Sequence, residues 1–348
     1  MVSQKKHLIL GGVGIIAIVA LLVGAYFLLD KSIAARVSNR VCIPSYVDGL
    51  VCYSQHQSLT TEQTTKITVS PDGKILASST HDIIHLWNLE TGKKQRTLSG
   101  HRDWVSALAI SPDGQTLASA SLDRTIKLWN LETGQLLKTL YSGRATTIAF
   151  SPDGQTLASG SRLIKWADGT LSRPGVQLWN LAAQEWQDTI GDQPVVAIAF
   201  SPNSELLAAG KQKTYLWRVS TKQLLQTVNS GDLTALTFSR DGETLLTGSS
   251  RMKLWSVTSG MLLHTFGIGA SDLALSPDGQ TLVAAVGGTM QFWQPDIEDY
   301  LGMLRGSSYS GLSVTFGLNG NTVISSSSDG IRIWHPNSFA APEGFFGQ

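Results

Sequence analysis

The sequence is poor in cysteine and in charge, and each shortage excludes a class of protein. Only two cysteines occur in 348 residues, too few for a disulfide-built scaffold or a four-thiolate zinc site. Charged residues make up 15% of the chain while 42% is hydrophobic, which excludes a mostly disordered protein. After residue 52 there are 22 basic and 24 acidic side chains, so the body lacks the basic field that nucleic-acid binding requires.

Motifs for catalysis and metal binding are also missing. The seven histidines show none of the spacings of metal sites, and neither a Gly-x-Ser-x-Gly elbow nor a glycine-rich phosphate loop occurs. Four aspartates recur at equivalent places in Ser-Pro-Asp-Gly turns, and turn chemistry explains them: Asp72, Asp113, Asp153 and Asp278. We therefore expect a protein that is not an enzyme and carries no metal or cofactor.

One long apolar run does occur, close to the N-terminus. Residues 8–29 contain no charge, and a helix of that length spans about 33 Å, enough to cross a bilayer core of about 30 Å. The alternative is a cleaved signal peptide, whose apolar region is usually shorter, at about 7 to 15 residues. We expect an uncleaved signal-anchor. Basic residues flank the run on both sides, so positive charges alone do not set its orientation.

The two cysteines indicate which side of the membrane the body occupies. Cys42 and Cys52 lie ten positions apart after the apolar run, and Pro44 and Gly49 between them allow a turn. An isolated pair of this kind favours a small disulfide loop, which persists outside the reducing cytosol; two unrelated thiols are the alternative. We therefore expect an extracytoplasmic body, in a periplasm or a thylakoid lumen.

The rest of the chain is periodic. A Ser-Pro-Asp-Gly turn or a variant of it recurs seven times, beginning at Ser70, Ser111, Ser151, Ser201, Ser239, Ser276 and Gly317. An apolar residue followed by tryptophan comes after each turn, with the tryptophans at Trp87, Trp129, Trp179, Trp217, Trp255, Trp293 and Trp334. Each unit reads as four short strands, and such a unit buries its faces only by stacking on neighbours around an axis.

These residues resemble the WD40 repeat family over about residues 55 to 336. The resemblance is fullest in the second unit, and it implies an all-β, seven-bladed β-propeller. It also implies a structural hydrogen-bond network that joins His101, Ser119 or Ser121, Asp123 and Trp129. The second unit carries a Gly-His pair, Gly100-His101, which is absent from the other units, so we expect those blades to depend on apolar packing.

Ring closure requires an outer strand for the last unit, which ends after its third strand at Ile333-Trp334. In the family, the segment before the first unit usually fills that place, and Ser54 to Thr60 is available here. We therefore divide the chain into a tail (1–7), a transmembrane helix (8–29), a neck (30–53), a propeller (54–336) and a C-terminal tail (337–348).

We predict the partner-binding residues from places where a unit differs from the common repeat pattern. In the third unit Trp179 lies 27 positions after Pro152, whereas the corresponding separation in the other units is 15 to 17. The excess lies around residues 162–175, and exposed loops of this kind often carry binding residues. Its predicted interface residues are Trp166, Arg162, Lys165 and Arg173; the alternative is a loop that buries its own tryptophan. Trp104 is expected to share that face, whereas Trp186 aligns with Leu136 and is expected to be packed.

The predicted function is a membrane-tethered, protein-binding scaffold or assembly factor. The regular repeats resemble those of bacterial and particularly cyanobacterial WD40 proteins, which implies a partner in a photosynthetic or respiratory membrane complex. The alternative is an enzyme or a propeller that binds a small ligand in its central channel. A scaffold predicts an aromatic and charged patch on one rim, and a ligand site predicts polar groups that converge at the channel mouth.

Overall fold

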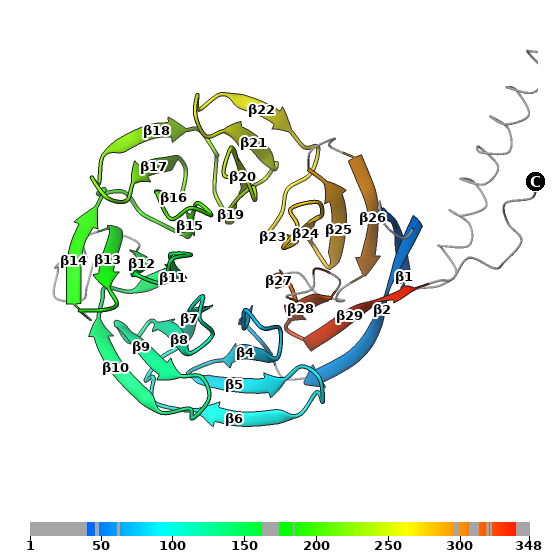
Figure 1. The fold of residues 1–348 in the computed structure, drawn as a ribbon, viewed down its shortest axis with the longest axis horizontal. Coiled ribbons are helices and arrows are strands. Elements are labelled where there is room, and N and C mark those ends of the chain that lie inside the picture. Colours follow the sequence, from blue (N-terminus) through cyan, green and yellow to red (C-terminus); the bar gives the residue numbers. More distant parts are fainter. Residues whose placement is uncertain are drawn as a thin grey trace, which may run out of the picture.

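Seven β-sheets are arranged as blades around a central axis (Figure 1). This computed structural model describes residues 40–45, 49–60, 63–161, 174–183, 185–295, 299–305, 313–317, 320 and 322–338. The predicted anchor, residues 8–29, lies outside the described residues. Among the helices of the described part of the chain, none is long and apolar enough to cross a membrane. The all-β, seven-bladed prediction is confirmed.

The first three blades each contain four antiparallel strands in sequence order from the axis outward. Blade 1 consists of β3 (Lys66–Val69), β4 (Ile75–Thr80), β5 (Ile83–Asn88) and β6 (Lys94–Leu98). Blade 2 consists of β7 (Val105–Ile110), β8 (Thr116–Ser121), β9 (Thr125–Asn130) and β10 (Leu136–Tyr141). Blade 3 consists of β11 (Ala145–Phe150), β12 (Thr156–Ser161), β13 (Gly175–Asn180) and β14 (Glu185–Ile190).

The next three blades repeat this order. Blade 4 consists of β15 (Ala197–Phe200), β16 (Leu206–Gly210), β17 (Thr214–Arg218) and β18 (Leu224–Val228). Blade 5 consists of β19 (Ala235–Phe238), β20 (Thr244–Gly248), β21 (Lys253–Ser256) and β22 (Leu262–Thr265). Blade 6 consists of β23 (Asp272–Leu275), β24 (Leu282–Val286), β25 (Thr289–Gln294) and β26 (Asp299–Arg305).

Blade 7 joins strands from the first and last parts of the described residues. Its inner strands are β27 (Ser313–Phe316), β28 (Val323–Ser327) and β29 (Gly330–Ser338), and β2 (Gly49–Thr60) pairs with β29 as the fourth strand. The predicted closure by Ser54 to Thr60 is therefore confirmed. Two details differ from prediction: the closing strand begins at Gly49, and part of the expected neck forms a fifth strand, β1 (Arg40–Ser45). Both differences have one cause: residues of the expected neck form an antiparallel pair, in which β1 folds back on the start of β2 and adds a strand to the outside of the sheet.

The turns between the first and second strands follow from their side chains. In blade 1, the Ser70 hydroxyl donates to Asp72 Oδ1 at 2.6 Å, and the same oxygen accepts the backbone N–H of Lys74 at 3.0 Å. Gly73 has a φ of 71°, a conformation that glycine adopts without steric cost. The turn thus satisfies its own polar groups, and the bond from Ser70 is the main reason why the pKa of Asp72 is lowered.

The hydrophobic core lies between blades rather than within them. Trp129 of blade 2 packs with Leu86 and Ile84 of blade 1, and Trp87 of blade 1 packs with Ile331 and Ile333 of blade 7. Each of these side chains is buried. Because every blade supplies one wall of two such clusters, stability comes from the closed ring as a whole.

The outermost strands face solvent, which corrects the expectation for Trp186. That residue does align with Leu136, since each lies opposite a repeat tryptophan on the neighbouring strand. However, Trp186 is 55% exposed, and Leu136 is exposed as well. The reason is topological: the fourth strand of a blade has no further strand outside it, so a large side chain there remains in contact with water.

Candidate functional site

The two ends of the propeller differ in the loops they carry. One end holds the Ser-Pro-Asp-Gly turns. The other, which we call the loop face, holds the connections from second to third strands and those between consecutive blades. The central channel opens there, at the first residues of the inner strands. Because the connection from β12 to β13 contains the blade 3 insertion and Trp104 lies between β6 and β7, both belong to the loop face.

Trp104 is an exposed aromatic side chain on a rigid backbone. The residue is 46% exposed, and its ring lies edge-on to the His81 ring, with centroids 4.8 Å apart. The carbonyl of Trp104 accepts the Leu122 N–H at 2.9 Å, and the next residue, Val105, donates its N–H to His81 O at 2.7 Å. These bonds fix the position of the aromatic pair at the junction of blades 1 and 2, a property expected of a binding anchor.

A groove of about 570 Å³ lies on the loop face beside blade 4. Lys211, Gln212 and Lys213 line it from the connection between β16 and β17, together with Tyr215 and Asp232. Both lysines are exposed. Pro194 also lines the groove, and its neighbour Val195 donates its N–H to the Ser161 carbonyl at 3.0 Å. Ser161 is the last residue before the insertion, so the groove lies at the point where the insertion begins.

The insertion itself carries four of the predicted binding residues. Trp166, Arg162, Lys165 and Arg173 all lie outside the described residues. The structure therefore places their attachment points on the loop face, and it gives no contacts for the side chains themselves.

The predicted network of blade 2 is present as a chain of hydrogen bonds. His101 Nδ1 lies 2.8 Å from Asp123 Oδ2, and His101 Nε2 lies 2.8 Å from Ser119 Oγ. Trp129 Nε1 donates to the same hydroxyl at 2.8 Å. A neutral imidazole fits this chain, because Nδ1–H donates to the carboxylate while Nε2 accepts the Ser119 proton, and the hydroxyl oxygen then accepts from Trp129.

The ionisation of this network agrees with its geometry. Burial lowers the pKa of His101, and the hydrogen bond and charge of Asp123 oppose that effect only in part. Burial alone would raise the pKa of Asp123. The hydrogen bonds from Thr125, the Arg102 N–H and His101 outweigh burial and lower it to about 2. The pair is thus a neutral imidazole beside a fixed carboxylate, which serves as structural support rather than acid–base chemistry.

Sequence reasoning missed a polar bond that recurs in blades without the Gly-His pair. The indole N–H of the repeat tryptophan donates to a serine or threonine hydroxyl of the second strand in five blades, from Trp87, Trp129, Trp179, Trp255 and Trp334 to Ser78, Ser119, Ser159, Thr247 and Ser325. In blade 6 that position is Ala284, and Trp293 Nε1 is buried without a partner among the described residues. The signal in the sequence is a serine or threonine that follows two apolar residues in the second strand of each of these five blades.

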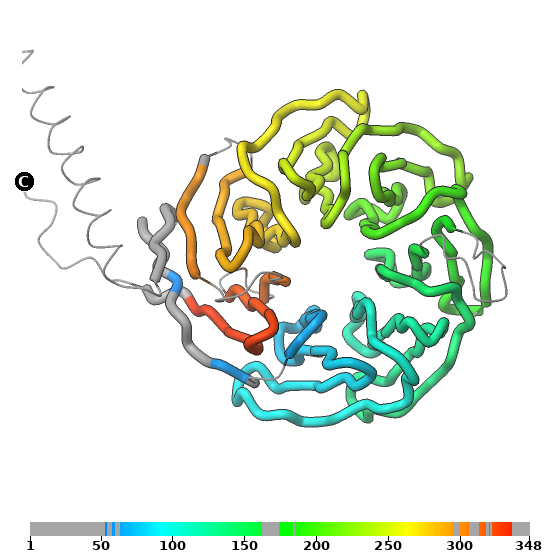
Figure 2. Tube along the Cα trace, turned by 180° about the vertical axis from the view of Figure 1, so that it is seen from behind, coloured from blue at the N-terminus to red at the C-terminus, as the bar shows by residue number. Residues whose placement is uncertain are grey.

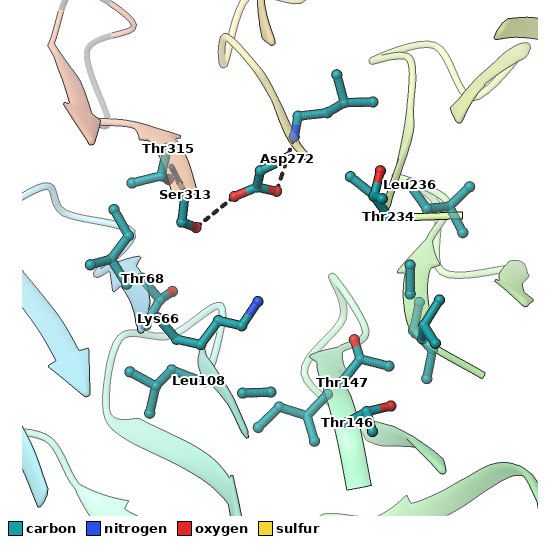
Figure 3. A pocket seen from close by; sticks show the side chains of 18 of the residues that line it. Lys66, Thr68, Leu108, Thr146, Thr147, Thr234, Leu236, Asp272, Ser313 and Thr315 are labelled. Atoms are coloured by element: carbon teal, nitrogen blue, oxygen red, sulfur yellow. Dashed lines mark hydrogen bonds between the residues drawn. The ribbon is translucent and has the colours of Figure 1, made fainter. Parts of the chain in front are cut away.

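The central channel contains polar groups that the sequence analysis did not single out. Its cavity has a volume of about 240 Å³ and is lined by the inner strands of all seven blades (Figure 3). Lys66, Asp272, Ser313 and several threonines face it. No group of three or more potential metal-ligating side chains occurs among the described residues, and the turn aspartates lie in separate blades.

Comparison with known proteins identifies the fold and the repeat type. A family model described as the IFT122 first β-propeller matches residues 29–271. The chain is 31% identical over 107 residues to an uncharacterised WD repeat-containing protein of Synechocystis sp., a stretch that covers 30% of each protein. It is 43% identical over 58 residues to apoptotic protease-activating factor 1 of Danio rerio, which covers 16% of this chain and 5% of that protein.

A solved structure extends this similarity to three dimensions. The crystal structure of the Myceliophteria thermophila Cps50 (Swd1) β-propeller domain aligns with a TM-score of 0.69 and 18% identity, covering 81% of this chain and 99% of that one. At this identity the match shows the fold alone. The alignments with the two sequence relatives described above span less than a third of those proteins' lengths.

Proposed function

The chain belongs to the IFT122 first β-propeller family of WD-repeat propellers, and we propose that it is a non-enzymatic docking scaffold that is tethered to a membrane. Residues 8–29 supply the tether. The partner is a protein of a membrane or extracytoplasmic complex. The similarity to a Synechocystis WD-repeat protein favours a photosynthetic or respiratory complex.

The observation that carries the proposal is the composition of the loop face. An exposed, rigidly held Trp104–His81 pair and a groove with two exposed lysines occur on the same end of the ring. The insertion beside the groove adds Trp166 and the basic residues Arg162, Lys165 and Arg173. Aromatic anchors with surrounding cations fit a partner that presents an apolar pocket and an acidic rim.

The tether is supported by the position of the ring's entry strand. The first described strand, β1, begins at Arg40, only ten residues after the apolar run, which holds the propeller close to the bilayer. The backbone register places Cys42 directly opposite Cys52 in the β1–β2 pair. Opposite residues in antiparallel pairs have Cα atoms about 4.5 to 5.5 Å apart, a separation that a disulfide spans. The register supports a bridge and, with it, an extracytoplasmic body.

The docking proposal is tested by capturing the partner with the full-length, detergent-solubilised protein and identifying it by mass spectrometry. The identified partner is then titrated against variants. Trp104→Ala and Trp166→Ala should each weaken binding by about thirtyfold, the equivalent of about 2 kcal/mol. Trp186→Ala is the matched control, since that tryptophan is also exposed but lies on an outer strand. Equal effects of all three variants would contradict a loop-face site.

The membrane and topology parts need a separate experiment. We expect non-reducing mass spectrometry of the native protein to find Cys42 linked to Cys52, and protease added to sealed vesicles to reach the propeller only from the extracytoplasmic side. Free thiols on a body that is digested from the cytosolic side would overturn this part of the proposal. They would leave the loop-face docking site intact.

A further inference from the structure

The channel wall is chemically asymmetric at one level. Seven residues hold the same position in the pairing of the first two strands: Lys66, Ala107, Thr147, Ala197, Ala235, Asp272 and Ser313. Five of these are small or hydroxylic. The two charged residues lie on blades 1 and 6, with Ser313 of blade 7 between them. A polar arc over blades 6, 7 and 1 therefore faces three alanines and Thr147 across the channel.

The negative end of this arc is held in a fixed orientation. Asp272 Oδ2 accepts the Ser313 hydroxyl at 2.6 Å and the Val314 N–H at 3.0 Å, and Asp272 Oδ1 accepts the Leu273 N–H at 2.9 Å. These bonds fix the carboxylate beside the cavity (Figure 3). A carboxylate offers about four acceptor sites, so one remains available to a donor in the channel.

The positive end of the arc extends into the same cavity. Lys66 is exposed, and its ammonium group points toward the middle of the channel (Figure 3). No ion pair joins the described residues Lys66 and Asp272. Two opposite charges thus line one cavity without direct contact. The flexible stem of a lysine lets its ammonium follow an anion over several ångströms.

We propose that the channel mouth binds a small zwitterion of the α-amino acid class. Its carboxylate pairs with Lys66 and its ammonium with Asp272, and Thr68, Ser313 and Thr315 line the same cavity. The two site charges sum to zero, so a ligand with a single charge leaves one of them unpaired. A cavity of about 240 Å³ is smaller than the roughly 300 to 1,000 Å³ of pockets for drug-sized ligands, which favours the smaller amino acids.

Isothermal titration calorimetry on the full-length protein in detergent tests this site. L-alanine and L-serine should bind saturably with one site per chain. Acetate and ethylammonium, which each carry one of the two charges, should bind at least tenfold more weakly. L-tryptophan should not bind, because of its volume. Acetate binding as tightly as alanine would overturn the zwitterion, and the absence of saturable heat with any amino acid would show that the channel holds only solvent.

Variants assign the roles of the two charges. Lys66→Gln should weaken alanine binding tenfold or more, as expected for the loss of a charge-assisted hydrogen bond, and Lys213→Gln in the loop-face groove is the matched control. Asp272→Asn should also weaken alanine binding tenfold or more. Because Asp272 also connects blades 6 and 7, the melting temperature of this variant is measured as well. Lys66 has no such structural contact in the described residues, and unchanged affinity in Lys66→Gln would refute the proposal whatever Asp272→Asn does. The site is independent of partner docking.

Discussion

Blade 2 and blade 6 have the same strand order, but blade 2 is stabilised by a network of polar side chains and blade 6 lacks one. In blade 2, His101, Asp123, Ser119 and Trp129 form one continuous hydrogen-bond chain within the blade. In blade 6 the equivalent serine is replaced by Ala284, and the indole N–H of Trp293 is buried without a partner among the described residues.

In blade 6, apolar packing against the closing strand β2 compensates for the missing hydrogen bond. Tyr53 of β2 is 3% exposed and stacks on Phe292 with ring centroids 5.1 Å apart. Burial, with a smaller contribution from the charge of Asp278, raises the pKa of Tyr53 to about 12, which keeps the phenol neutral. The comparison teaches that a repeat can lose its internal polar network when a neighbour supplies enough apolar contact.

The largest effect on stability is expected when the contact between Tyr53 and Phe292 is removed. Tyr53→Ala should lower the free energy of unfolding by about 3 to 5 kcal/mol, because a large buried aromatic leaves a cavity at the blade 6–blade 7 junction. Urea denaturation followed by tryptophan fluorescence measures the change. Tyr141→Ala is the control, since Tyr141 is 82% exposed and should change stability by no more than about 0.5 kcal/mol. Similar losses in both variants would refute a special role for the closing strand.

The corresponding test in blade 2 disrupts its hydrogen-bond network. Ser119→Ala removes the hydroxyl that both His101 Nε2 and Trp129 Nε1 contact, so we expect a loss of about 2 to 4 kcal/mol in the free energy of unfolding. Ser159→Ala in blade 3 is the matched variant. There the bond from Trp179 is longer, at 3.4 Å, and the loss should be about 1 kcal/mol. If Ser159→Ala costs as much as Ser119→Ala, the histidine adds nothing to the network.

The comparison is sharpened by giving blade 6 the missing acceptor. Ala284→Ser places a hydroxyl where five other blades have one, and it should raise the free energy of unfolding by about 0.5 to 1.5 kcal/mol by pairing the Trp293 N–H. Ala285→Ser is the control, because Ala285 is buried in the apolar cluster around Tyr53 and Phe292 and should destabilise. A loss in both variants would mean that the site has no room for the oxygen.

The smallest expected effect is on pH dependence. Because the folded-state pKa of His101 lies below its ordinary value of 6.5, the unfolded chain takes up the proton first as pH falls. Stability contributed by the neutral imidazole is therefore complete above about pH 6.5 and declines below it. Denaturation curves at pH 7.5 and 5.5 should show a smaller decline for His101→Gln than for the natural chain. An equal decline would assign the effect to other groups.

The sequence was sufficient to predict the ring. The Ser-Pro-Asp-Gly turn and the repeat tryptophan recur with nearly constant spacing, and a four-stranded unit buries its faces only by stacking on its neighbours. The sequence also located the closing strand. It did not reveal the exposure of Trp186, since alignment with Leu136 says nothing about which face of an edge strand meets water. Nor did it indicate the asymmetry of the channel, because Lys66 and Asp272 are 206 positions apart and become neighbours only when blades 6, 7 and 1 assemble into the ring.

Strands β2 and β29, far apart in the sequence, lie side by side in blade 7 (Figures 1 and 2), and this separation affects how the protein folds during synthesis. Strand β2 ends at Thr60, and its partner β29 ends at Ser338, so β2 leaves the ribosome well before its partner. At roughly 5 to 20 residues per second, β2 waits about 15 to 55 seconds during synthesis before its partner exists. During that interval β1 can cover one edge of β2, but the edge that later pairs with β29 stays open, and an open strand edge invites association with other chains.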